Sequence, residues 1–148
     1  MPRSAGFATM TSAERWACDT SVAVASLDPT HEAHSACRRV VVERRPALAG
    51  HAAFETYSVL TRRPPPLRIT GVQAAAVLAD AFPEPCSLVP GSAASILARL
   101  ADAEVVGGSV YDALVGLAAG DNAMTLLTRD RRAQRTCDAM HVEYQFVT

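Results

Sequence analysis

Short apolar runs alternate along the chain with longer segments in which apolar residues recur at helical spacing. The apolar runs predict strands, and they lie at residues 15–19, 46–51, 86–90, 124–128 and 141–147. The longer segments predict helices, and they cover residues 20–27, 30–45, 52–63, 70–82, 91–103, 109–120 and 130–140. Because strands that alternate with helices favour a parallel sheet covered by helices, the pattern predicts an α/β sandwich.

Proline and glycine residues mark the ends of several of these predicted elements. The prolines at 64–66 end the predicted helix that begins at residue 52. Pro83 ends the alanine-rich helix predicted over 70–82. Gly120 stands where a helix over 109–120 would need a C-terminal cap.

The chain is 148 residues long, which is enough for one domain with a buried core. Residues 15–148 are predicted to form this single domain. Residues 1–14 are mostly small and polar, so they are predicted to be a flexible N-terminal extension.

The composition is that of a globular protein, with 49% hydrophobic and 20% charged residues. No apolar run approaches the roughly 20 residues that cross a bilayer, and the first residues lack the apolar centre of a secretory signal. We therefore expect a cytoplasmic protein. Its four cysteines form no CxxC pair, so we expect reduced thiols rather than a zinc or dithiol site.

Lysine is absent, so all 14 basic residues are arginine and the net charge is -1. The absence of lysine excludes a Walker A loop, a Schiff-base mechanism and the phosphorylation site of a receiver domain. The arginines occur in clusters, which fit either phosphate binding or solvated helix faces.

Four acidic residues occupy positions that draw attention to a site. Asp19 and Asp130 each follow a predicted strand, and in open parallel sheets the carboxyl ends of strands form binding sites. Glu55 and Asp112 are each the lone acid within a largely apolar helical stretch, where an unpaired carboxylate is costly.

Ordinary structural roles are the alternative for each of these acids. Asp19 and Asp130 suit helix N-caps, and Ser109 to Asp112 has the spacing of a capping box. Glu55 fits a solvated helix face. Capping and cation binding do not exclude one another, and oxygen ligands without a His or Cys set favour Mg²⁺ or Mn²⁺ over zinc.

Taken in order, five short motifs resemble the PIN-domain family and, within it, the VapC toxins of bacterial toxin-antitoxin pairs. The likeness covers nearly everything from Cys18 to Val147. Its motifs are DTSV at Asp19, DPTHEAH at Asp28, FETYSVLTRRPPP at Phe54, GGSVYDALVGLAA at Gly107 and LLTRDRR at Leu126. The resemblance implies a three-layer α/β/α sandwich with a short-stranded, mainly parallel central sheet.

The resemblance also implies a function and roles for the acids. It implies a Mg²⁺- or Mn²⁺-dependent endoribonuclease toxin that hydrolyses RNA phosphodiester bonds and inhibits growth or translation until an antitoxin neutralises it. Asp19 and Asp112 are expected to ligate the metal directly, and Glu55 and Asp130 directly or through water. All four are expected to be catalytic.

Substrate contacts are expected beside this cluster. Arg129, Arg131 and Arg132 would offset the repulsion between the acids and the phosphates, and Thr20 and Thr128 would steady the site. Aromatic residues make up only 5% of the chain, so base stacking is not expected to be the main grip on RNA. His51 is expected to be a surface or core-edge residue rather than a metal ligand.

The resemblance further implies three partners: the RNA substrate, a VapB-like antitoxin and a second copy of the chain. Contact with DNA is expected only indirectly, through the antitoxin. The alanine-rich segments over 70–82 and 92–100 could form the contact in such a homodimer, or could pack only internally. A membrane partner is not expected.

Two rival functions remain for such a chain. A PIN-like RNA-binding or regulatory module without catalysis would keep the fold but not the reaction. A haloacid-type phosphatase would require DxDx[TV] after the first strand, whereas this chain has DTSVA at Asp19.

Overall fold

A parallel four-stranded sheet forms the centre of the protein. The computed structural model describes residues 14–91 and 93–148, so the predicted N-terminal extension lies, apart from its last residue, outside the described residues. The strands are β1 (Trp16–Cys18), β2 (Ala47–Leu48), β3 (Thr125–Thr128) and β4 (Tyr144–Phe146).

The strand order is β2-β1-β3-β4, and every neighbouring pair is parallel. β1 and β3 are therefore adjacent at the centre, with Cys18 of β1 opposite Leu127 of β3. Parallel neighbours end at the same edge of the sheet, so the residues that follow β1 and β3 come together there.

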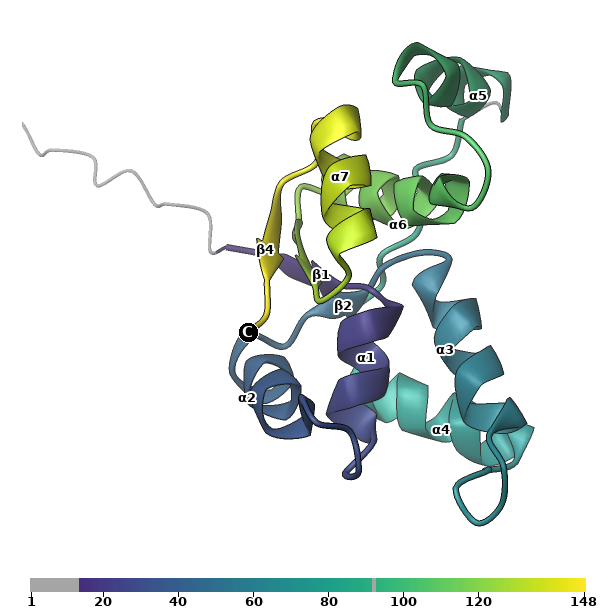
Figure 1. The fold of residues 1–148 in the computed structure, drawn as a ribbon, viewed down its shortest axis with the longest axis vertical. Coiled ribbons are helices and arrows are strands. Elements are labelled where there is room, and N and C mark those ends of the chain that lie inside the picture. The colour runs from purple at the N-terminus through teal and green to yellow at the C-terminus, as the bar shows by residue number, and fades with distance from the viewer. Residues whose placement is uncertain (1–13, 92) are drawn as a thin grey trace, which may run out of the picture.

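Helices cover both faces of this sheet. They are α1 (Thr20–Leu27), α2 (His34–Arg44), α3 (Ala52–Arg62), α4 (Gly71–Ala81), α5 (Ala93–Asp102), α6 (Ser109–Asp121) and α7 (Arg131–Met140). Figure 1 shows α6 and α7 on one side of the strands and α1 and α2 on the other. The predicted three-layer α/β/α fold is confirmed.

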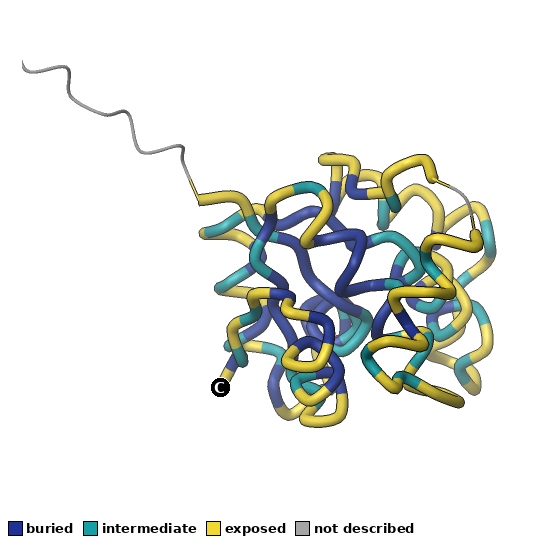
Figure 2. The backbone as a smooth tube through the Cα atoms, turned by 90° about the horizontal axis from the view of Figure 1, so that it is seen from above, coloured by how far each residue is buried: buried dark blue, intermediate teal, exposed yellow. Residues whose placement is uncertain are grey.

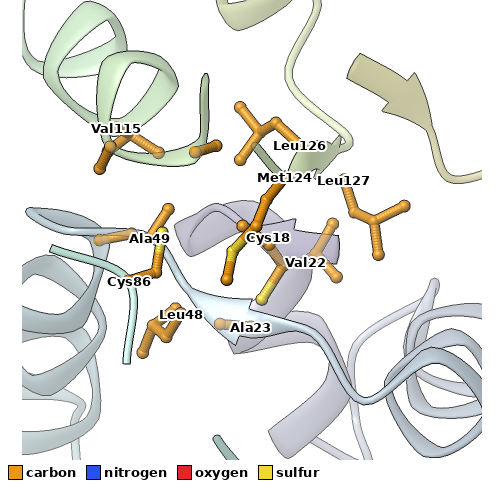
Figure 3. Close-up of a cluster of buried hydrophobic side chains, with 14 of the residues drawn as sticks. Cys18, Val22, Ala23, Leu48, Ala49, Cys86, Val115, Met124, Leu126 and Leu127 are labelled. Carbon is orange, nitrogen blue, oxygen red and sulfur yellow. The ribbon is translucent and has the colours of Figure 1, made fainter. Parts of the chain in front are cut away.

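The core lies between the sheet and these helices. In Figure 2 the buried segments, in dark blue, lie in the interior of the molecule. Leu126 and Leu127 of β3 and Val22 of α1 are fully buried, and Figure 3 shows them around Cys18. Alanine and cysteine side chains make up much of this core, and their small size allows the helices to approach the strands closely.

All four cysteines are free and buried, as predicted for thiols that fill the core. Burial raises the pKa of Cys18 well above its ordinary value and the pKa of Cys137 to about 12. Such thiols stay protonated near neutral pH and are poor metal ligands or nucleophiles.

The strand predicted at residues 86–90 is wrong. This segment has no strand pairing, although Cys86 is buried. Pro85 and Pro90 lack an N–H for a sheet ladder, and the carbonyl of Cys86 instead accepts a hydrogen bond from the N–H of Gly50 at 2.6 Å.

The predicted cap at Gly120 is also wrong, because α6 continues to Asp121 and Asn122 is its C-cap. The residue with left-handed backbone is Ala123, with φ at 55°. Gly120 lies within the helix, where a Cβ atom would sit 3.7 Å from Val142.

The α5 helix lies apart from the sheet in Figure 1 and exposes much of its surface. Leu97 is 63% exposed, while Leu100 is buried. Among the helices in the described parts of the chain, none is long and apolar enough to cross a bilayer.

Candidate active site

The carboxyl ends of β1 and β3 place two acids side by side. Asp19 directly follows β1, and its N–H donates to the carbonyl of Leu127 on β3 at 3.1 Å. Asp130 comes two residues after β3 ends. Both acids are N-caps, Asp19 of α1 and Asp130 of α7, so the predicted capping roles are confirmed.

Three donors hold the carboxylate of Asp19. Its Oδ1 accepts from the Ser21 hydroxyl at 2.5 Å and from the N–H of Val22 at 3.2 Å, while its Oδ2 accepts from the hydroxyl of Thr128. The Thr128 hydroxyl in turn accepts from the N–H of Asp130 at 3.0 Å. Thr128 therefore links the two acids that follow the central strands.

The environment of Asp19 works against its ionisation. The residue is only 8% exposed, and burial raises the pKa of its carboxyl. The hydrogen bonds from Ser21, Thr128 and Val22 lower the pKa in part, and the negative charge of Asp130 raises it again. A bound cation would favour the ionised form of such a group.

Glu55 approaches the same place from α3. Its Oε2 accepts from the Thr20 hydroxyl at 3.1 Å, and its Oε1 lies 3.5 Å from Nε2 of His51. Gly50 before α3 has φ at 45°, and a Cβ there would lie 2.9 Å from the Cβ of Ala118 on α6. This close approach holds the loop before α3 against α6, the helix that carries Asp112.

Asp112 lies in the first turn of α6. The capping box predicted from Ser109 to Asp112 does not form, because the N-cap is Gly108 and no side chain caps the helix. Burial raises the pKa of the Asp112 carboxyl, and the charges of Asp130, Asp19 and Glu55 raise it further. The charges of these carboxylates therefore act on one another.

The predicted acids, Asp19, Glu55, Asp112 and Asp130, line one pocket of about 60 Å³ together with Thr20 and Ser21. This pocket has room for an ion with one or two waters. Its donor set is oxygen only, and its repelling carboxylates fit a hard divalent cation. Within residues 14–91 and 93–148, no three His, Cys, Asp or Glu side chains are already gathered as a metal-ligand set.

A wider pocket of about 760 Å³ opens beside the acids and shares Glu55, Asp112 and Asp130 with the smaller one. Arg132 and Arg135 of α7 line it. Arg132 is also near Asp130, with its Nε 3.6 Å from Oδ1.

The other two predicted substrate arginines lie elsewhere. Arg129 and Arg131 lie over the ring of Phe146 on β4, at 5.8 and 5.6 Å from its centroid. The guanidinium of Arg129 also donates to the carbonyl of Val147 at 2.5 Å. Of the three arginines predicted to contact the substrate, Arg132 is the one that lines the wide pocket.

Sequence reasoning missed several residues of the two pockets. Ser21 is not among the residues predicted for the site, although its hydroxyl also accepts from the N–H of Arg129 at 2.9 Å. His51, Tyr111 and Arg135 line the wider pocket. The motif around Asp112 contains Tyr111, but spacing alone does not show which way the ring turns.

Comparison with known proteins gives the family. The family model described as PIN domain matches residues 17–139, which include all four acids. The chain belongs to the PIN-domain family.

Named relatives cover most of this chain. Ribonuclease VapC27 of Mycobacterium tuberculosis H37Rv is 45% identical over 126 residues, which are 85% of this chain and 92% of that protein. Ribonuclease VapC40 of the CDC 1551 strain is 46% identical over 131 residues, or 88% of this chain and 97% of that protein. The predicted resemblance to VapC-type PIN domains is therefore confirmed.

Proposed function

We propose that this PIN-domain protein is a divalent-metal-dependent endoribonuclease that acts as the toxin of a toxin-antitoxin pair. The observation that carries the proposal is the pocket at the carboxyl ends of β1 and β3, which all four predicted acids line. The names of the relatives, both ribonucleases, support the same reaction class.

Asp19 and Asp112 are the proposed direct ligands of Mg²⁺ or Mn²⁺, with Glu55 and Asp130 completing the shell directly or through water. Burial, and then the charge of Asp130, raise the pKa of both Asp19 and Asp112, so a cation bound between these two acids would favour their ionised forms. When bound, the cation would stabilise negative charge on the scissile phosphate and activate the attacking water.

Neighbouring polar residues orient the acids. The hydroxyls of Ser21 and Thr128 fix the Asp19 carboxylate, and the Thr20 hydroxyl fixes Glu55. Glu55 and Asp130 lie at the border between the small and the wide pocket, so either is placed to accept a proton from the attacking water. The nearby His51 ring, with Nε2 3.5 Å from Oε1 of Glu55, would also help to orient this carboxylate.

Arginine side chains offset the repulsion between the acids and the RNA backbone. Arg132 lines the wide pocket beside Asp130, and Arg135 follows it one helical turn later. Their guanidinium groups are suited to hold the phosphates on either side of the scissile bond.

The proposed regulator is a VapB-like antitoxin. The four-acid pocket is small and negative, and an arginine from a partner would fit it in charge and shape. We also propose a homodimer. The two alanine-rich helices expected at the dimer contact, α4 and α5, lie at opposite ends of the molecule in Figure 1. A single two-fold contact would therefore use one of them and not both. Each helix exposes an apolar side chain, Leu97 of α5 at 63% and Val72 of α4 at 83%, so the proposed contact uses one of the two helices.

Substitution of one proposed ligand tests the function. Asp112→Asn should reduce Mg²⁺-dependent RNA cleavage by about 100-fold or more, because it removes a ligand charge with little change in shape. RNA binding should persist. The readout is cleavage of labelled RNA, with 5′-end mapping of cellular RNA after brief induction to find the target.

The matched control is Asp121→Asn at the other end of α6, where the carboxylate pairs with Arg99 at 3.3 Å. That variant should cleave at the wild-type rate. Full activity of Asp112→Asn would remove Asp112 from the proposed metal shell. No cleavage by the wild type with either metal would favour the rival RNA-binding module without catalysis.

A further inference from the structure

Two aromatic rings stack at the entrance to the acid pocket. His51, next to the N-terminus of α3, and Tyr111, in the first turn of α6, have ring centroids 5.1 Å apart and planes inclined by 22°. Both line the wide pocket that contains Glu55, Asp112 and Asp130. The ring pair is therefore a wall of the proposed substrate pocket.

The stack is open to solvent on one side. Tyr111 is 54% exposed even though His51 lies against one of its faces, which leaves the opposite face as the main open surface. Phe54 adds a third ring, tilted and 6.4 Å from His51. An exposed aromatic cluster is notable in a chain with only 5% aromatic residues.

The stack is also fixed relative to the acids. Tyr111 directly precedes Asp112 on α6, and His51 lies one helical turn before Glu55, with Nε2 3.5 Å from Oε1. The backbone positions of the rings are thus set by the same segments that carry two of the four carboxylates. A base that rested on Tyr111 would thus have a fixed position relative to the bond to be cut.

We propose that His51 and Tyr111 form a platform on which one unpaired RNA base stacks beside the scissile phosphate. This inference rests on the proposed ribonuclease function and adds a specificity element to it. Each base has a flat π-face, and stacking on aromatic side chains is a common way to hold single-stranded RNA.

The arginines that line the pocket and the pocket's size are consistent with a bound nucleotide. Arg132 and Arg135 line the same pocket and can hold the phosphates while the base lies on Tyr111. The pocket volume of about 760 Å³ lies within the range of small-ligand sites.

The platform implies that RNA is single-stranded at the cleavage site. In a duplex both faces of a base are covered by its neighbours, so none is free to stack on Tyr111. The protein would then cut RNA where a base is unpaired and can turn out of its stack.

Binding measurements with Asp19→Asn as the parent test the platform without cleavage. The probe is a labelled ten-nucleotide RNA, its versions with one abasic position each, and a blunt duplex of the same sequence, all in Mg²⁺. Tyr111→Ala and Tyr111→Leu should weaken binding of the intact strand by roughly 5- to 100-fold, and Tyr111→Phe should not.

The abasic series gives the sharper result. In the parent, removal of one particular base should weaken binding by a similar factor. This sensitivity should vanish in Tyr111→Ala and in Tyr111→Leu. Tyr57→Ala on α3, a half-exposed tyrosine outside the pocket, is the control and should keep the parent profile. Thermal unfolding of each variant checks the fold.

The outcomes separate this inference from the proposed function. An unchanged abasic profile in Tyr111→Ala and Tyr111→Leu, or equal affinity for the duplex, would overturn the platform even if the wild type cleaves RNA. Ring-dependent binding by a wild type that does not cleave would overturn the nuclease function and leave the platform standing.

Discussion

Thr128 is the residue on which the geometry of the acid pair most depends. Its buried hydroxyl donates to Asp19 and accepts from the N–H of Asp130, so one side chain sets the orientation of two proposed catalytic groups. Residues that orient ligands commonly affect activity without touching the metal.

Thr128→Val should therefore damage both stability and activity. The substitution keeps the shape but leaves the Asp130 N–H without its acceptor and Asp19 without one donor, at a cost of about 1–3 kcal/mol in the free energy of unfolding. Cleavage should slow by roughly 10- to 100-fold. Denaturant unfolding and cleavage assays measure the two effects.

The control for Thr128→Val is another buried threonine. Thr56 of α3 donates to the carbonyl of Ala52 in its own helix at 2.7 Å, so Thr56→Val removes a hydroxyl without touching the acids. Equal cleavage rates in the two valine variants would show that Thr128 does not orient the site.

At the scale of elements, the ends of α1 and α3 away from the site are joined by one charged contact. Asp28, the C-cap of α1, pairs with Arg63, the C-cap of α3, at 3.3 Å. Asp28 also accepts from the N–H and hydroxyl of Thr30 at 2.9 and 2.7 Å. This contact fixes α3, and with it Glu55, relative to α1.

The pH dependence of folding should reveal this contact. The hydrogen bonds from Thr30, and then the charge of Arg63, lower the pKa of Asp28 below its ordinary value of 3.8. Because the unfolded chain takes up the Asp28 proton first as pH falls, the ionised group stabilises the fold above pH 3.8. That contribution is lost as pH falls through the lowered folded-state pKa.

Asp28→Asn should accordingly lower the Tm at pH 7 by roughly 2–4 °C, the shift that about 1 kcal/mol produces at this size. The difference from wild type should shrink below pH 3.8. Asp80→Asn on α4 makes the same charge change at an exposed position and is the control. A difference that stays constant down to pH 2 would argue against the charged contact.

The sequence predicted the order of elements well because strand and helix periods are local properties. It also located the acids, since Asp19 and Asp130 follow neighbouring central strands. It did not find the His51–Tyr111 stack, which depends on how α3 and α6 are rotated. Likewise, spacing could not show that Arg129 and Arg131 turn to Phe146, a residue on the edge strand.

At the scale of the whole molecule, the sheet order brings acids from four separate elements to one edge. The β1–β3 pairing supplies Asp19 and Asp130, while α3 and α6 supply Glu55 and Asp112. Like charges gathered in this way oppose folding unless a counter-charge is present. We therefore propose that this edge of the sheet binds a hard divalent cation.

Calorimetric titration of Mn²⁺ into the protein, with Mg²⁺ as competitor, tests this claim most directly. We expect that the wild type and Asp121→Asn bind Mn²⁺ alike, that Mg²⁺ competes, and that Asp19→Asn and Asp112→Asn each bind at least about tenfold more weakly. Equal Mn²⁺ affinity in the wild type and in the Asp19→Asn, Asp112→Asn double variant would contradict it.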